Sequence, residues 1–333
     1  SIDGAGRPTK PEEHRPARLR DALVRRSCMN IGLLIDRVAA QLDDAGVAFG
    51  HGTTNAFDEA AWLVLWQLGL PLHSELAGPG SVADEPVTAQ QLAQVSALVQ
   101  KRIMSRVPAA YLTQEAWLQG VSFHVDERCI VPRSLIGELL ANGVLDTWLP
   151  SDASRLLDLC TGGASLAILA AMAYPDLQVD AADISSPALE VAQINLARHG
   201  LCDRIRLRQG DGLAGADGMY DIILCNPPYV NADSMADLPP EYRAEPALAL
   251  AGGLDGMDFV RRLLADAPAA LQAQGVLVLE IGHERQHFES AFPSLEAVWM
   301  ETSAGHDQVC IVTGDALRAL HSRQPSEPVS PAP

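Results

Sequence analysis

The sequence predicts an α/β fold in which a doubly wound, mainly parallel sheet follows a small helical domain. From Arg155 onward, short apolar runs alternate with helix-length segments, as in strands joined by crossover helices. Between residues 19 and 107, apolar residues recur at helical spacing instead. The chain has 333 residues and 48% hydrophobic content, which is enough for one large core and a smaller second domain.

The helical stretches come first along the chain. They are LLIDRVAAQL, then AAWLVLWQLGL, which the cap-like Asp58 precedes, and AQQLAQVSALVQKRI, which Thr88 opens. Residues 108–133 contain a glycine followed by alternating apolar residues, which predicts a hairpin linker. Residues 1–18 and 321–333 have few apolar side chains and several prolines, so we expect a disordered leader and a disordered tail.

The sheet lies in the remaining segment, residues 134–320. Its strand-like runs are RLLDLC, QVDAADI, RIRLRQGD, YDIILC and GVLVLEI, and its helix-like runs are SLAILAAMA, PALEVAQINLARHG and DFVRRLLADAPAALQ. Ligands of such sheets bind at the carboxyl ends of the strands, near the point where the strand order reverses. Polar residues at those ends are therefore the candidate functional residues.

Composition excludes several classes of protein. Lys and Arg number 24 against 42 Asp and Glu, and the net charge of −18 opposes binding to phosphate, so we expect no stable nucleic-acid binding. The acidity serves either solubility or a basic partner. Six cysteines without paired spacing predict neither disulfides nor a zinc site, and no metal is expected. The apolar runs are too short for a membrane span and no signal peptide opens the chain, which favours a cytoplasmic location.

The first strand of the sheet ends in a turn of small residues that precedes a helix. Such residues let the backbone approach a ligand closely, and the helix start offers free N–H donors. A tight strand-to-helix turn without a ligand explains the same residues. The candidate cofactor-binding residues here are Asp158, Cys160, Thr161, Gly162, Gly163 and Ala164.

Two further carboxylates predict a nucleoside ligand. Asp183 closes the second strand roughly 20 residues beyond the glycine turn, a spacing at which a carboxylate accepts both ribose hydroxyls. Its alternative role is a helix N-cap, for which Ser185 is the better candidate. Asp211, after the third strand, either meets an adenine amino group or is a turn residue in Gly-Asp-Gly.

The loop Asn226-Pro227-Pro228-Tyr229 directly follows the buried strand YDIILC. Two prolines fix the backbone and remove N–H donors, so the loop presents the Asn226 side-chain oxygen and a neighbouring backbone carbonyl as acceptors. Together they can hold both hydrogens of an NH₂ group. An amide nitrogen is a poor nucleophile, so such a loop would orient it and stabilise the developing charge, while Tyr229 stacks on the planar substrate group.

Two weaker candidates lie outside this loop. Glu280, at the end of GVLVLEI, either lines the same cleft as a substrate-binding residue or is an exposed strand terminus. Arg133 either anchors the linker to the sheet domain through an ion pair or helps to form the substrate entrance, and we favour the structural role. The histidines lack partner cysteines or a nucleophile and are expected at the surface or in a satisfied core.

With these residues considered, the chain resembles the HemK family of protein glutamine methyltransferases from about Phe49 to Val312. The sequence Pro-Arg-Ser-Leu-Ile-Gly-Glu at 132–138 resembles the branch that acts on large-subunit ribosomal protein L-three, whereas release-factor methyltransferases have an arginine flanked by prolines there. The further segments that carry the resemblance are FGHGTTNAFDEA, RVPAAYLTQEAW, VDERCIVPRSLIGEL and DLPPEYRAEPALALAGGLDGMDF.

The resemblance implies a Rossmann-like class I methyltransferase domain, with seven strands of which one is antiparallel, and a helical substrate-recognition domain. It also implies S-adenosylmethionine as cofactor and a glutamine of basic ribosomal protein L-three as substrate, and it predicts no oligomeric state. The alternatives are a release-factor glutamine methyltransferase, an adenine amino methyltransferase that acts on nucleic acid, and a non-catalytic assembly factor.

The glycine turn departs from the family pattern. The family generally has glycine at the position of Ala164 and a small polar residue at that of Gly163. Alanine can replace glycine where φ is negative, and its methyl group leaves room for the methionine part of the cofactor, at some cost in affinity.

Overall fold

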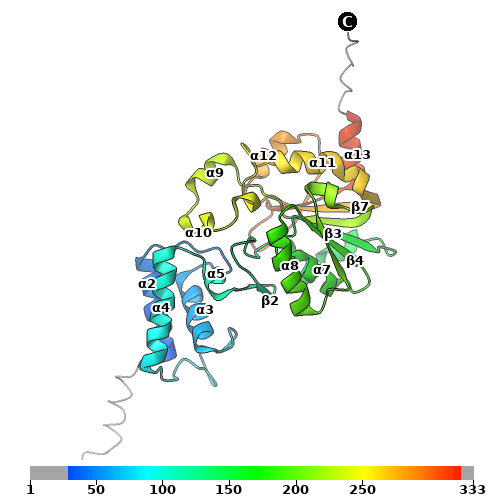
Figure 1. Cartoon of the computed structure of the whole chain (residues 1–333). Coiled ribbons are helices and arrows are strands. Elements are labelled where there is room, and N and C mark those ends of the chain that lie inside the picture. The colour runs from blue at the N-terminus through cyan, green and yellow to red at the C-terminus, as the bar shows by residue number, and fades with distance from the viewer. Residues whose placement is uncertain (1–28, 324–333) are drawn as a thin grey trace, which may run out of the picture.

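The computed structural model describes residues 29–323, which form a helical part and a larger sheet part (Figure 1). A short two-stranded hairpin lies between them. None of the helices within residues 29–323 combines the length and apolar character that a membrane crossing requires. The expected leader and residues 19–28 of the expected helical domain lie outside the described residues.

Caps fix where the helices of the N-terminal part begin. The side chain of Asn55 accepts a hydrogen bond from the Asp58 N–H, so Asn55 is the cap and Asp58 lies in the first turn, contrary to the expectation. Thr88 and Gln91 form a reciprocal capping box, as the position of Thr88 predicted. The helices are α2 (Ile31–Asp44), α3 (Ala56–Leu68), α4 (Ala89–Ser105) and α5 (Ala109–Thr113).

The hairpin pairs β1 (Glu115–Leu118) with β2 (Val121–His124) in antiparallel register. Gly120 occupies the turn with a φ of 75°, a conformation that glycine adopts at little cost. The segment expected to be a linker from residue 108 begins instead with helix α5. After the hairpin, α6 (Ile136–Ala141) and a 3₁₀ turn (Val144–Trp148) lead into the sheet.

Seven strands form the large sheet in the order β5-β4-β3-β6-β7-β9-β8. Five neighbouring strands run parallel, and only β9 runs against its two neighbours, which confirms the predicted mainly parallel sheet with one antiparallel strand. The order reverses between β3 and β6. The strands are β3 (Arg155–Leu159), β4 (Gln178–Asp183), β5 (Ile205–Gln209), β6 (Tyr220–Cys225), β7 (Leu271–Glu280), β8 (Val298–Trp299) and β9 (Val309–Thr313).

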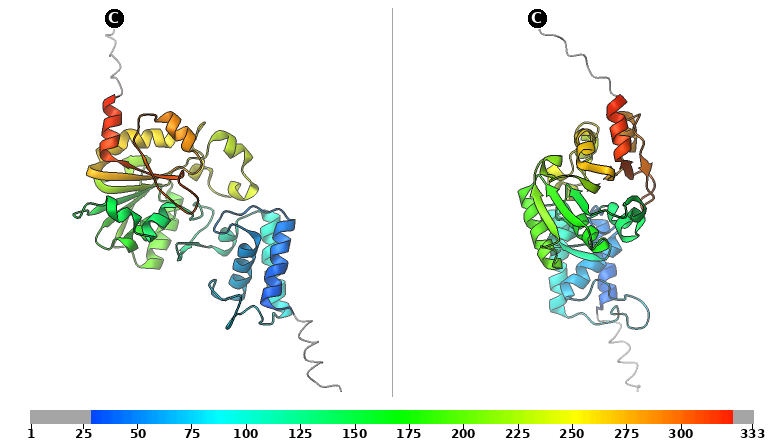
Figure 2. Two further views of the ribbon diagram at one scale, coloured as in Figure 1. Left: turned by 180° about the vertical axis from the view of Figure 1, so that it is seen from behind. Right: turned by 90° about the vertical axis from the view of Figure 1, so that its right-hand side faces the viewer.

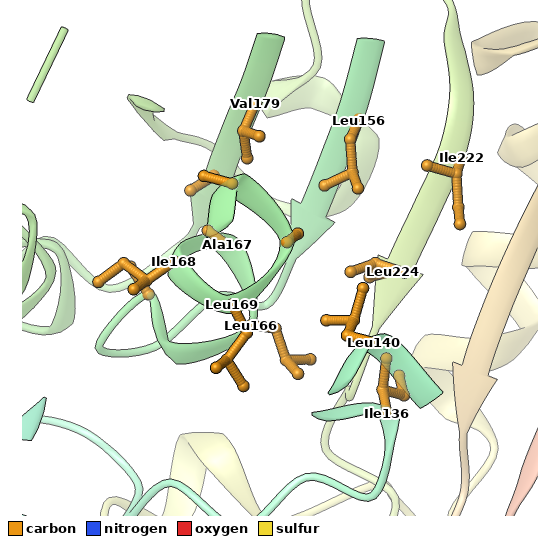
Figure 3. Packing of buried hydrophobic residues seen from close by; sticks show 14 of the residues in the cluster. Ile136, Leu140, Leu156, Leu166, Ala167, Ile168, Leu169, Val179, Ile222 and Leu224 are labelled. Carbon is orange, nitrogen blue, oxygen red and sulfur yellow. The ribbon is translucent and has the colours of Figure 1, made fainter. Parts of the chain in front are cut away.

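Helices cover both faces of this sheet (Figure 2). Successive residues of one strand enter different cores: Leu156 packs beneath α6, α7 and α8, whereas Leu157 packs beneath α11, α12 and α13. Figure 3 shows the first core, in which side chains of α7 meet those of three strands. The helices are α7 (Ser165–Ala173), α8 (Ser186–His199), α9 (Ala232–Asp237), α10 (Pro240–Arg243), α11 (Asp258–Ala270), α12 (Arg285–Ala291) and α13 (Gly314–Arg323).

Helix α13 extends past the start of the expected tail at residue 321. The helix continues through residues 321–323, and His321 Nδ1 lies 2.9 Å from the Leu317 carbonyl oxygen one turn earlier. The rest of the expected tail lies outside the described residues.

Candidate functional site

A cavity of about 570 Å³ opens at the carboxyl ends of β3, β4 and β6, where the strand order reverses. This is where a doubly wound sheet places its ligands, and the volume suits a small molecule. The structure brings six of the predicted site residues to its wall: Cys160, Gly162, Asp183, Asp211, Asn226 and Pro228. The others lie behind the wall or beside the cavity.

The turn after β3 is held from inside by Asp158. This carboxylate is buried and accepts hydrogen bonds from the Thr161 hydroxyl and, at 3.0 Å, from the Ala167 N–H. Burial raises the pKa of Asp158 to about 7, although these hydrogen bonds act in the opposite direction. Asp158 and Thr161 thus shape the turn and do not line the cavity.

The negative φ at which alanine can replace glycine is not present at Ala164. Its φ is 64°, because the tight passage from β3 into α7 requires left-handed backbone at Cys160, Gly162 and Ala164 alternately. The Ala164 side chain is fully buried in the core beneath α7 and does not line the cavity, and neither does Gly163. The methyl group therefore acts on backbone conformation and core packing.

Asp183 lies at the cavity wall with its carboxylate half-buried. Its two oxygens accept hydrogen bonds from the backbone N–H groups of Gly162, at 2.9 Å, and Ser185, at 2.8 Å. Burial raises the pKa of Asp183 above its ordinary value, against the effect of these donors. Ser185 is the N-cap of α8, as predicted, since its hydroxyl accepts from the Ala188 N–H.

Asp211 is exposed and forms an ion pair with Arg262 of α11 at 2.8 Å. This hydrogen-bonded pair lowers the pKa of Asp211. Asp211 and Arg262 both line the cavity. One oxygen of the Asp211 carboxylate therefore already accepts a hydrogen bond from Arg262, which lies far away in the sequence.

The loop after β6 places Asn226 half-buried at the cavity and Pro227 behind it. Within residues 29–323, no hydrogen bond engages the Asn226 side chain. Beyond the loop, the Val230 N–H donates to the Leu250 carbonyl and the Gly252 N–H donates to the Val230 carbonyl, both at 2.8 Å. The exit of the loop is therefore fixed, while the Asn226 amide remains free to bind a ligand.

Neither role considered for Glu280 matches its position. The side chain is 4% exposed and does not line the cavity, because the start of α6 covers this end of β7. One carboxylate oxygen accepts from the Ser134 hydroxyl at 2.6 Å and from the Leu135 N–H at 2.9 Å. Burial raises the pKa of Glu280 to about 7 despite these donors.

Arg133 anchors the linker, as predicted. Its guanidinium binds both oxygens of Glu245 at 2.7 Å, and the Val131 N–H donates to the same carboxylate. His51 of the helical part is buried against the ring of Tyr242, with Nε2 3.3 Å from Glu245. Tyr229 is half-buried near this cluster and is not among the residues that line the cavity.

The sequence reasoning missed the apolar wall of the cavity. Ile184 is 47% exposed directly after Asp183, Leu248 is 58% exposed, and Phe259 comes from α11. Exposed Ile184 has a signal in the sequence, since it follows the last strand residue at the ligand-binding edge. Leu248 has none, because it lies in a short 3₁₀ turn without regular periodicity. Phe259 has none either, because its place in the first turn of the predicted helix α11 does not reveal that it faces a ligand.

Comparison with known proteins agrees with this geometry. Residues 139–238 match the family model described as "Methyltransferase small domain". Proteins named ribosomal protein uL3 glutamine methyltransferase are 54% identical in Bordetella pertussis (85% of this chain, 95% of the relative), 49% in Burkholderia pseudomallei (86% and 95%) and 46% in Neisseria meningitidis serogroup B (84% and 91%). The predicted resemblance is thus confirmed: the chain belongs to the family of ribosomal protein uL3 glutamine methyltransferases, enzymes that use S-adenosylmethionine as methyl donor.

Proposed function

We propose that this enzyme methylates the side-chain amide nitrogen of a glutamine in ribosomal protein uL3, the large-subunit protein L-three. Support comes from the names of three relatives that are 46–54% identical to this chain. The matched region covers 91–95% of the length of each relative. The net charge of −18 suits a basic ribosomal protein as partner. We place the reaction in the cytoplasm, where ribosomal proteins are made, and assign substrate recognition to the helical part.

The cavity fits the cofactor. S-adenosylmethionine, when bound, supplies an electrophilic methyl group on a sulfonium centre. The Asp183 carboxylate can accept the two ribose hydroxyls, and Asp211 can accept from the adenine amino group. Ile184 and Phe259 offer apolar surface to a purine. Cys160 and the side-chain-free Gly162 let the backbone of the turn approach the ligand.

The chemistry is assigned to the loop after β6. The Asn226 side-chain oxygen and the backbone carbonyl of Pro227 would accept the two N–H groups of the glutamine amide and turn its nitrogen toward the methyl group. The N–C bond would form as the methyl–sulfur bond breaks and its electron pair leaves on the sulfur. The nitrogen would then become more positive, which would strengthen both hydrogen bonds. One amide proton then leaves to water. Pro228 keeps the loop rigid, and Tyr229 walls the planar amide.

One observation carries this proposal. Asn226, whose side chain has no hydrogen-bond partner within residues 29–323, shares a cavity wall with Asp183. Asn226 would hold a planar NH₂ group and Asp183 a nucleoside. A nucleoside methyl donor beside an NH₂ group supports methyl transfer to an amide or amine.

The test is transfer of radiolabelled methyl from S-adenosylmethionine to purified uL3, to release factors and to an adenine-containing oligonucleotide. We expect label on uL3 alone. In Asn226→Ala, kcat/KM should fall by about 10²-fold or more, because a transition-state hydrogen bond is lost. Cofactor binding measured by calorimetry should persist.

Other distributions of label would overturn parts of the proposal. Label on release factors alone would retain the chemistry but change the substrate. Label on the oligonucleotide would assign the loop to a base amine. Cofactor binding without label on any substrate would indicate a non-catalytic assembly factor, and full activity of Asn226→Ala would refute the assigned role.

A further inference from the structure

Three glycines enclose Tyr229, the last residue of the proposed catalytic loop. Gly282 lies against its ring: a Cβ atom at this position would be 2.5 Å from Tyr229 Cε2 and 3.0 Å from Cζ. Real contacts of Cβ atoms do not come this close, so a side chain at Gly282 must displace the ring or the backbone. Gly282 thus marks one limit of the space that the tyrosine can occupy.

The backbone of Tyr229 is enclosed in the same way. A Cβ atom at Gly252 would lie 2.7 Å from Tyr229 Cα, and one at Gly256 would overlap the Tyr229 carbonyl oxygen. Since Val230 is hydrogen-bonded to Leu250 and Gly252, this backbone has little freedom to move away. A displaced ring must therefore rotate about its own side-chain bonds.

The sheet explains why Gly282 meets this ring. Strands β6 and β7 are parallel neighbours, with Cys225 opposite Leu279. The residues that follow them in the chain, Tyr229 and Gly282, therefore leave the same edge of the sheet side by side. Gly282 has a φ of 53°, which turns the chain away at this edge and places its Cα beside the aromatic ring.

We propose that Gly282 is a positioning residue for the methyl transfer. By lacking a side chain, it admits the Tyr229 ring into one position. Tyr229, held in that position three residues after Asn226, orients the glutamine amide. The catalytic effect of Gly282 rests on the proposed function. The steric coupling between Gly282 and Tyr229 is independent of it.

The experiment is a double-variant cycle of Gly282→Ala with Tyr229→Ala, with Gly200→Ala as matched control. Gly200 also has a left-handed backbone, with φ of 67°, but no atom lies within 4 Å of a Cβ placed there. It therefore reproduces the backbone strain without the steric contact. Methyl transfer to uL3, cofactor affinity and Tm are measured for each protein.

We expect Gly282→Ala to lower kcat by about 10- to 100-fold with cofactor Kd unchanged, since misplacement by about 1 Å has effects of this size. Gly200→Ala should stay within about twofold of the parent. In the Tyr229→Ala background, Gly282→Ala should cause little further loss. An equal loss in both backgrounds, or a loss no larger than that of Gly200→Ala, would overturn the proposal.

The unfolding measurement separates this inference from the proposed function. Gly282→Ala should lower Tm more than Gly200→Ala does, and the excess should disappear once Tyr229 is alanine. If the parent enzyme does not methylate uL3, the proposed function fails, yet this Tm cycle still decides the coupling. An excess that persists without the tyrosine ring would refute it.

Discussion

Asp158 shows how a single residue can serve a ligand site without touching the ligand. It is buried beneath the turn after β3 and holds Thr161 and Ala167 by hydrogen bonds. Because its pKa rises from 3.8 to about 7, the folded protein favours its protonated form. Stability contributed by that form is complete below about pH 4 and is lost as the pH rises through about 7.

Asp158→Asn removes this titration while retaining an oxygen acceptor for the turn. The free energy of unfolding of the variant, relative to the parent, should therefore increase as the pH rises from about 4 to about 7. Urea unfolding of both proteins across this range measures the difference. A difference that does not change with pH would show that Asp158 does not titrate as its burial implies.

At the scale of elements, Glu280 joins the end of β7 to the start of α6. Its Oε2 accepts hydrogen bonds from the Ser134 hydroxyl and the Leu135 N–H, and a third, longer one from the Ile136 N–H. These N–H groups belong to the first turn of a helix, where no carbonyl of the helix itself can accept from them. The carboxylate thereby fixes α6 to the sheet and, through it, the linker that borders the site.

Glu280→Ala should destabilise the protein by about 1–3 kcal/mol, because it leaves buried donors without an acceptor. Glu280→Gln keeps one oxygen in place and is the matched control. We expect it to retain most of the stability at pH 7, where the parent carboxyl is partly protonated in any case. Equal losses in denaturant unfolding would argue against the helix-capping role.

At the scale of the whole molecule, buried charges join the helical part to the sheet part. Arg102 of α4 is fully buried and lies 2.8 Å from Glu59 of α3 and 3.2 Å from Glu241 of α10. Arg106 reaches the same Glu241 oxygen at 2.9 Å. Figure 1 shows α10 above the N-terminal helices, although some 140 residues separate it from α4.

Arg102→Ala should lower the free energy of unfolding by about 3–5 kcal/mol, since it leaves two buried carboxylates with fewer partners. Lys101→Ala, at an exposed neighbouring position of the same helix, should change it by less than about 0.5 kcal/mol. Calorimetry would also show whether the two parts then unfold separately. A loss similar to that of Lys101→Ala would show that the buried network does not couple the parts.

The sequence determined those features that depend on neighbours along the chain. Apolar periodicity identified the strands around RLLDLC and YDIILC and the helices between them, and short polar residues identified the caps Thr88 and Ser185. The loop at Asn226 could be recognised because both the strand and the residues after it are local. In each case, one short segment contains the whole signal.

Only the tertiary structure decided which distant groups meet. The ion pair of Asp211 with Arg262, the burial of Glu280 and the contact of Gly282 with Tyr229 each join segments that the fold brings together. The left-handed backbone at Ala164 also escaped prediction, because the path from β3 into α7 imposes it on a residue that does not favour it. Local patterns specify elements, whereas steric fit and charge pairing depend on through-space distances that only the packed chain sets.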